Sequence, residues 1–186
     1  MSNCFREGST PRTAIGQFRT FVPEFKKSIL ILGLEMTNNA GVTAVDHTGF
    51  SVSSLEEAIQ FWTEALGFDL SRQGEMGGAF LREATGIDDP RCRMALVTAP
   101  NGYPIELLEY STRLKLGRAP QNAGAIGAAH LAVTVSDIQA AIIRVEAAGW
   151  QVNGSPQPIP AGPRAGTVVA YVSGPDGITI ELMQPT

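Results

Sequence analysis

The residues of this sequence that could perform chemistry are its histidines and two isolated glutamates. His47 and His130 are the only histidines in the chain. Glu106 and Glu181 each stand between an isoleucine and a leucine in a strand-like apolar run. An unpaired carboxylate buried there would cost several kcal/mol, so each glutamate needs a partner. Imidazole and carboxylate together are typical ligands of divalent metal ions.

These four residues belong to an internal repeat. PNGYPIELLEY at Pro100–Tyr110 is matched by PDGITIELMQP at Pro175–Pro185, each with a tight hairpin turn followed by a strand that contains the glutamate. Upstream, the string that begins at His47 is matched by the string that begins at His130. The same module, in which a histidine precedes a glutamate, is therefore used twice.

If the two modules pair about a pseudo-twofold axis, His47, Glu106, His130 and Glu181 converge on one point. For any single residue of this kind a structural role would be the better interpretation, but the repetition favours a shared site. Two nitrogens and two oxygens suit one divalent ion such as Zn, Ni, Co, Mn or Fe(II) and leave positions open for a substrate. We therefore predict a metal site at these residues.

Strands and helices, indicated by the spacing of apolar residues along the sequence, would position the ligands. Residues 45–52 and 128–135 read as strands with small residues on the histidine face, which we expect to line a cavity, and bulky residues on the other. Helices follow, with capping boxes at Ser53 and Ser136 and terminators at Gly67 and Gly149. Further strands are expected at 68–71, 79–83, 93–98, 151–153 and 167–172, with a loop at 154–166.

Each module is thus βαβββ, and we predict an α+β fold in which two paired modules form a cup-shaped, partly open barrel. The expected divisions are an N-terminal extension of unknown role at 1–41, a first module at 42–110, a linker at 111–127 and a second module at 128–186. Met36 would be a natural start for the first module, so translation starting there is a further hypothesis. The linker permits pairing of modules within one chain or between two.

The composition narrows the classes of partner. A net charge of −4 without a basic run argues against nucleic acid and against an anionic membrane surface, and favours a small-molecule substrate. Cys4 and Cys92 lie far apart and have no metal-binding spacing, which indicates a reducing compartment. The longest apolar run near the start is too short to span a bilayer. A cytoplasmic protein is expected.

With these residues in place, the chain resembles the vicinal oxygen chelate superfamily, which includes glyoxalase I, methylmalonyl-CoA epimerase, extradiol dioxygenases and bleomycin resistance proteins. The resemblance covers residues 42–185 and implies paired βαβββ modules around one divalent metal ion, with homodimers among the expected assemblies. Its ligand positions fall on His47, Glu106, His130 and Glu181.

The resemblance implies three kinds of function. The four-ligand set is most similar to the glyoxalase and epimerase branch, a lyase or isomerase in which the metal acts as a Lewis acid and a carboxylate moves a proton next to a carbonyl. Glu181 and Glu106 are then the catalytic candidates. A ring-cleaving dioxygenase that uses Fe(II) or Mn(II) is an alternative, although both histidines are already used as ligands. A non-catalytic protein that binds a drug is another.

Other polar residues are weaker candidates for the site. Glu109, expected on the opposite face of its strand and solvated, and Asp88 or Asp89 in a loop are possible bases. Substrate contacts could come from Arg91, Arg93, Tyr103, Arg164 and Tyr171.

Overall fold

The computed structural model describes residues 41–88, 90–112 and 122–186. All the helices and strands described below lie within the unit Ala44–Thr186. Most of the expected N-terminal extension, including Met36, lies outside the described residues. Residues 113–121 of the expected linker and Asp89 lie outside them as well.

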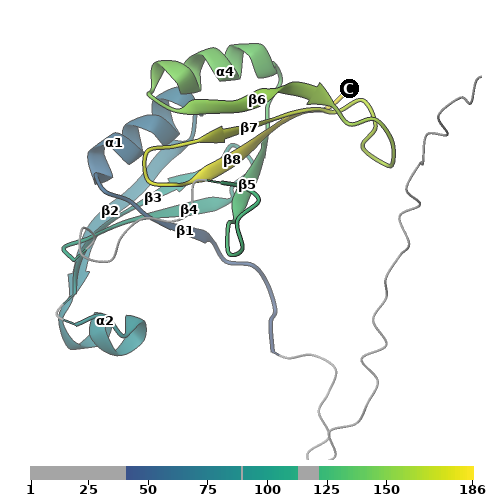
Figure 1. Ribbon diagram of the computed structural model, residues 1–186. Helices are drawn as coiled ribbons and strands as arrows, with labels where there is room; N and C mark the ends of the chain where they lie inside the picture. Colours follow the sequence, from purple (N-terminus) through teal and green to yellow (C-terminus); the bar gives the residue numbers. More distant parts are fainter. Residues whose placement is uncertain (1–40, 89, 113–121) are drawn as a thin grey trace, which may run out of the picture. The chain divides into compact units, whose positions relative to one another are not determined.

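Two four-stranded sheets with the same topology form the body of this unit (Figure 1). In each sheet the first strand of the module pairs in parallel with the last strand, and the other pairs are antiparallel. The first sheet has the order β1 (Thr48–Ser51), β4 (Pro104–Tyr110), β3 (Arg91–Thr98), β2 (Asp69–Gly77). The second has the order β5 (His130–Thr134), β8 (Thr179–Gln184), β7 (Val168–Ser173), β6 (Gln151–Pro158). The α+β class and the repeat are confirmed; the sheets do not close into a barrel.

The two predicted helices are present, but each begins one residue later than expected. Helix α1 (Leu55–Gln60) continues as the π-helical segment η1 (Phe61–Ala65), and α4 spans Ile138–Ala147. The capping side chains are Ser54 and Asp137, which accept from backbone N–H groups of the first turn. Ser53 and Ser136 were therefore wrong as caps, because two adjacent residues could serve and the sequence pattern does not choose between them.

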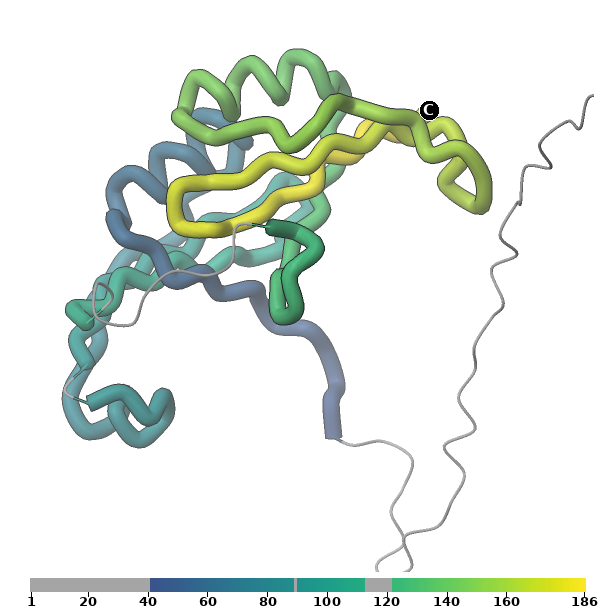
Figure 2. Tube along the Cα trace, viewed as in Figure 1, coloured from purple at the N-terminus to yellow at the C-terminus, as the bar shows by residue number. Residues whose placement is uncertain are grey.

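The prediction of a strand at 79–83 was wrong, because this segment lies within helix α2 (Gly78–Thr85). Its alanines, leucine, arginine and glutamate are good helix formers, and Gly86 ends the helix with a φ of 71°. Figure 2 shows α2 beyond the end of β2. The outer strand of the first sheet, next to β3, is β2, which extends to Gly77.

Other strand limits also differ from the expected ones. β1 begins at Thr48 and is shorter than the predicted run, so His47 immediately precedes the strand. β6 continues to Pro158 through part of the expected loop. A shift of register between Asn153 and Gln157 accommodates the irregular sequence at that point.

Among the described residues, both modules contribute to a single hydrophobic core. At its centre the rings of Phe61 and Trp150 stack with centroids 3.8 Å apart and an interplanar angle of 8°. The central strands present fully buried aliphatic residues to this core. These are Ile105 and Leu107 on β4, and Ile180 and Leu182 on β8. The helix-covered faces of the two sheets are therefore turned toward each other.

Candidate functional site

The first predicted pair, His47 and Glu106, comes together at the β1–β4 edge of the first sheet. Gly49 is the register partner of Glu106 across this parallel pair. His47 Nε2 lies 3.4 Å from Glu106 Oε2. A Cβ added at Gly49 would lie 3.8 Å from the same carboxylate oxygen, so Gly49 lies directly beside the Glu106 carboxylate.

The second pair repeats this arrangement in the second sheet. Ala132 is the register partner of Glu181 across the β5–β8 edge. His130 Nε2 lies 3.4 Å from Glu181 Oε2, the same atoms at the same separation as in the first pair. The structure therefore brings together each histidine with the glutamate of its own module.

The separation within each pair fits two ligands of one metal ion. Nitrogen and oxygen ligands bound at about 2.1 Å lie roughly 3.0–3.4 Å apart when they occupy neighbouring coordination positions. The observed 3.4 Å is at the upper end of this interval and exceeds the usual length of an N–H···O hydrogen bond. The donor atoms and their spacing are therefore suited to a divalent ion.

Both pairs lie on the sheet faces that are turned away from the shared core. Side chains alternate along a strand, so Glu106 and Glu181 point opposite to their buried neighbours on β4 and β8. On the histidine faces Gly49, Ala132 and Thr134 are exposed. Within residues 41–88, 90–112 and 122–186, no three His, Cys, Asp or Glu side chains are grouped closely enough to bind a metal. One chain thus presents two separate His–Glu pairs, which we call half-sites.

Asp46 orients the histidine of the first pair. Its Oδ1 lies 2.6 Å from His47 Nδ1, which leaves Nε2 directed at Glu106. The hydrogen bond to Asp46 raises the pKa of His47. Carboxylates that hold the second nitrogen of a ligand histidine are common behind metal sites. This role of Asp46 was not predicted from the sequence, although the adjacent Asp46-His47 dipeptide is a signal that could have indicated it.

Tyr171 distinguishes the second pair from the first. It is the register partner of Glu181 across β7 and β8, and its ring contacts the His130 ring edge-on with centroids 5.2 Å apart. Burial, followed by the nearby Glu181 carboxylate, raises the pKa of the Tyr171 phenol. Leu96 occupies the equivalent position opposite Glu106. The polar surroundings of the two half-sites are therefore not equivalent.

Glu109 was expected to be solvated, and this was wrong. Its side chain is 9% exposed and accepts hydrogen bonds from the Leu55 backbone N–H and from Arg93. Arg93 also forms two bonds to Glu56, at 2.6 and 2.9 Å. Arg93 thus fixes α1 to the sheet, and its guanidinium is engaged on the helix side.

The other candidates have different surroundings. The Tyr103 hydroxyl lies 3.0 Å from the Thr48 hydroxyl and joins β1 to the turn before β4. Asp88 lies in an exposed bend. Arg91 lines a cavity of about 570 Å³ beside Cys92, whose pKa is raised to about 11 by burial.

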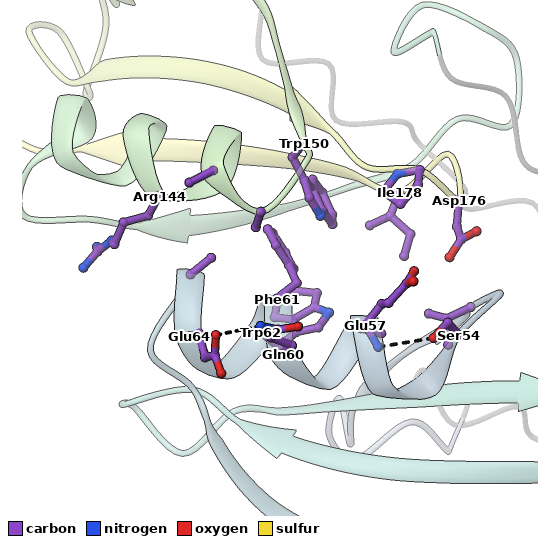
Figure 3. A pocket seen from close by; sticks show the side chains of 16 residues that line it. Ser54, Glu57, Gln60, Phe61, Trp62, Glu64, Arg144, Trp150, Asp176 and Ile178 are labelled. Carbon is purple, nitrogen blue, oxygen red and sulfur yellow. Dashed lines mark hydrogen bonds between the residues drawn. The ribbon is translucent and has the colours of Figure 1, made fainter.

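A cleft of about 500 Å³ lies between α1 and α4 (Figure 3). Its floor includes the stacked Phe61 and Trp150, while Glu57 and Asp176 lie at one end. None of the four predicted ligands is among the described residues that line it. This cleft is therefore separate from the candidate metal site.

No described helix is long and apolar enough to cross a membrane.

Comparisons with known proteins point to one superfamily. The family model for the Glyoxalase/Bleomycin resistance protein/Dioxygenase superfamily matches residues 44–182. A 2-epi-5-epi-valiolone epimerase of Actinomyces sp is 31% identical over 147 residues, covering 77% of this chain and 80% of the relative.

A lactoylglutathione lyase of Arabidopsis thaliana is 27% identical over 138 residues, which span 74% of this chain and 43% of that longer relative. A glyoxalase family protein from Bacillus cereus superposes with a TM-score of 0.69 at 23% identity, covering 80% of this chain and 98% of that structure. This likeness supports the fold. The chain belongs to the Glyoxalase/Bleomycin resistance protein/Dioxygenase superfamily.

Proposed function

We propose that this protein is a divalent-metal-dependent lyase or isomerase that moves a proton next to a carbonyl group of a small oxygenated substrate. The observation that carries the proposal is the pair of identical His–Glu half-sites, each with 3.4 Å between Nε2 and Oε2. The relatives named as an epimerase and as a lactoylglutathione lyase support this branch of the superfamily.

The complete site would be shared between two copies of the chain. Within one copy the half-sites lie on faces turned away from the common core, and each offers only two ligands. A second copy could place its His130 and Glu181 opposite His47 and Glu106 of the first. Two such sites would form in one homodimer with twofold symmetry.

The four residues would hold one ion of Zn, Ni, Co, Mn or Fe(II). When bound, the metal supplies Lewis acidity that makes a proton beside a substrate carbonyl easier to remove. The donor set alone does not select the ion, since imidazole and carboxylate suit all of these metals.

The glutamates would move the proton. Each carboxylate projects from the middle of a strand whose neighbouring residues are fully buried, so its position above the sheet is well defined. Glu181 is the first choice of base by similarity to glyoxalase I. Glu106, which stands at the equivalent position of the first half-site, is the second candidate base.

Metal content and activity test the proposal together. Protein purified without chelator should contain about one transition-metal ion per chain, and Glu106→Ala and His130→Ala should each lose most of it. Glu57→Ala, which removes an exposed carboxylate on α1, is the matched control and should retain the metal.

Activity is then assayed by formation of lactoylglutathione from the hemithioacetal of glutathione and methylglyoxal, and by epimerisation of 2-epi-5-epi-valiolone; the thioester and the cyclitol are the compounds in the relatives' names. Oxygen uptake with catechols serves as a counter-assay. The proposal would be contradicted if wild-type protein bound no metal even after reconstitution. It would also be contradicted if oxygen consumption were the sole activity.

A further inference from the structure

The segment that connects β6 to β7 forms a defined loop at one end of the second half-site. Its two ends are joined by hydrogen bonds from the Ile159 N–H to the Thr167 carbonyl and from the Gly166 N–H to the Ile159 carbonyl, both at 2.9 Å. A third bond runs from the Thr167 N–H to the carbonyl of Arg164. The backbone that carries Arg164 is therefore held in place by the loop's own hydrogen bonds.

The Arg164 side chain reaches the sheet face that bears Glu181. Its Nη1 donates to Met183 Sδ at 3.5 Å. Met183 follows Glu181 by two residues on β8, so both side chains emerge on the same face about 6.8 Å apart along the strand. Met183 is only 8% exposed although it lies outside the main core cluster.

The positive charge of Arg164 has no carboxylate partner among the described residues. A thioether sulfur is a weak acceptor, whereas a guanidinium offers five donors. Arg93, by contrast, is bound by both Glu56 and Glu109. Arg164 therefore retains donors in the planar arrangement that binds carboxylate or phosphate with two parallel hydrogen bonds.

We propose that Arg164 binds an anionic group of the substrate, so that the substrate carries a carboxylate or phosphate a few atoms from the reacting carbonyl. The inference rests on the proposed function, because it takes His130 and Glu181 as the centre of the site. Arg164 would restrict the substrates to anionic compounds, and the second half-site would recognise their charged group. Tyr171, on the same face and against His130, adds to the polar character of this half-site.

Two probes with the same metal-binding group test this inference by calorimetry. Acetohydroxamate binds divalent metals through two oxygens and carries no further charge, whereas succinic monohydroxamate adds a carboxylate tail. Metal-loaded wild-type protein should bind the second about tenfold more tightly, because a charge-assisted hydrogen bond contributes that much. Arg164→Gln should reduce this preference to less than about twofold, leave acetohydroxamate affinity unchanged and retain the metal.

The control is Arg144→Gln, which removes an exposed arginine on α4 at the cleft between the helices and should leave the preference unchanged. Equal affinity of wild-type protein for the two probes, or a preference that persists in Arg164→Gln, would overturn the role of Arg164 and leave the proposed function intact. Absence of metal uptake, or of any hydroxamate binding by the loaded protein, would overturn the proposed function and this inference with it.

Discussion

Replacement of Trp150 tests the packing that turns the two half-sites away from each other. The indole is 6% exposed and stacks on Phe61, which comes from the other module. Truncation of a buried tryptophan to alanine costs about 3–5 kcal/mol, because apolar contact is lost and a cavity remains. At roughly 3 °C per kcal/mol for a unit of this size, Trp150→Ala should lower Tm by about 12 °C.

Urea denaturation followed by far-UV circular dichroism would measure this loss. Ile143→Ala is the matched control, because it removes a large aliphatic side chain that is 68% exposed on α4, the helix that precedes Trp150. Its free energy of unfolding should change by less than about 0.5 kcal/mol. A Trp150→Ala variant as stable as Ile143→Ala would refute the shared core.

A double-mutant cycle isolates the contact between the modules. Phe61→Leu, Trp150→Leu and the double variant should show a coupling energy of about 0.5–1.5 kcal/mol, as expected for an aromatic pair in direct contact. Additive effects would mean that the two rings do not pack together in solution. The outward orientation of the half-sites would then lose its main support.

Three further substitutions follow from individual contacts. Gly174→Ala should lower the free energy of unfolding, measured by urea denaturation, by about 1–3 kcal/mol, because the added Cβ would lie 2.6 Å from the indole of Trp150. An unchanged urea midpoint would contradict this contact. Glu109→Gln should destabilise the protein by about 1–3 kcal/mol, and Glu56→Gln should destabilise it clearly less, because only the Glu109 carboxylate is buried; equal losses would contradict the assignment. Asp46→Asn should weaken metal binding about 10–100-fold in a chelator competition, because it alters the group that orients His47; unchanged affinity would show that Asp46 has no such role.

The sequence predicted the local features that repeat. Hairpin turns before Glu106 and Glu181, and the alternation around them, were sufficient to predict two strands of equivalent register, and the structure pairs each glutamate with its own histidine. These features depend on a few consecutive residues and on strand periodicity.

The sequence did not predict features that depend on departures from the repeat or on distant contacts. Symmetry between modules favoured a strand where the helix-forming residues of α2 stand. Glu109 was judged by alternation alone, although its burial depends on Arg93 and on the start of α1. How the modules pack is decided by rings such as Phe61 and Trp150, which are distant in sequence.

The most direct test of the account is complementation between two inactive variants. One chain carries His47→Ala with Glu106→Ala, and the other carries His130→Ala with Glu181→Ala; each alone should bind no metal. If two copies share each site, a heterodimer isolated through two different tags regains one intact site and binds one metal ion. If all four ligands come from one chain, the heterodimer stays metal-free, and that result would contradict the shared site.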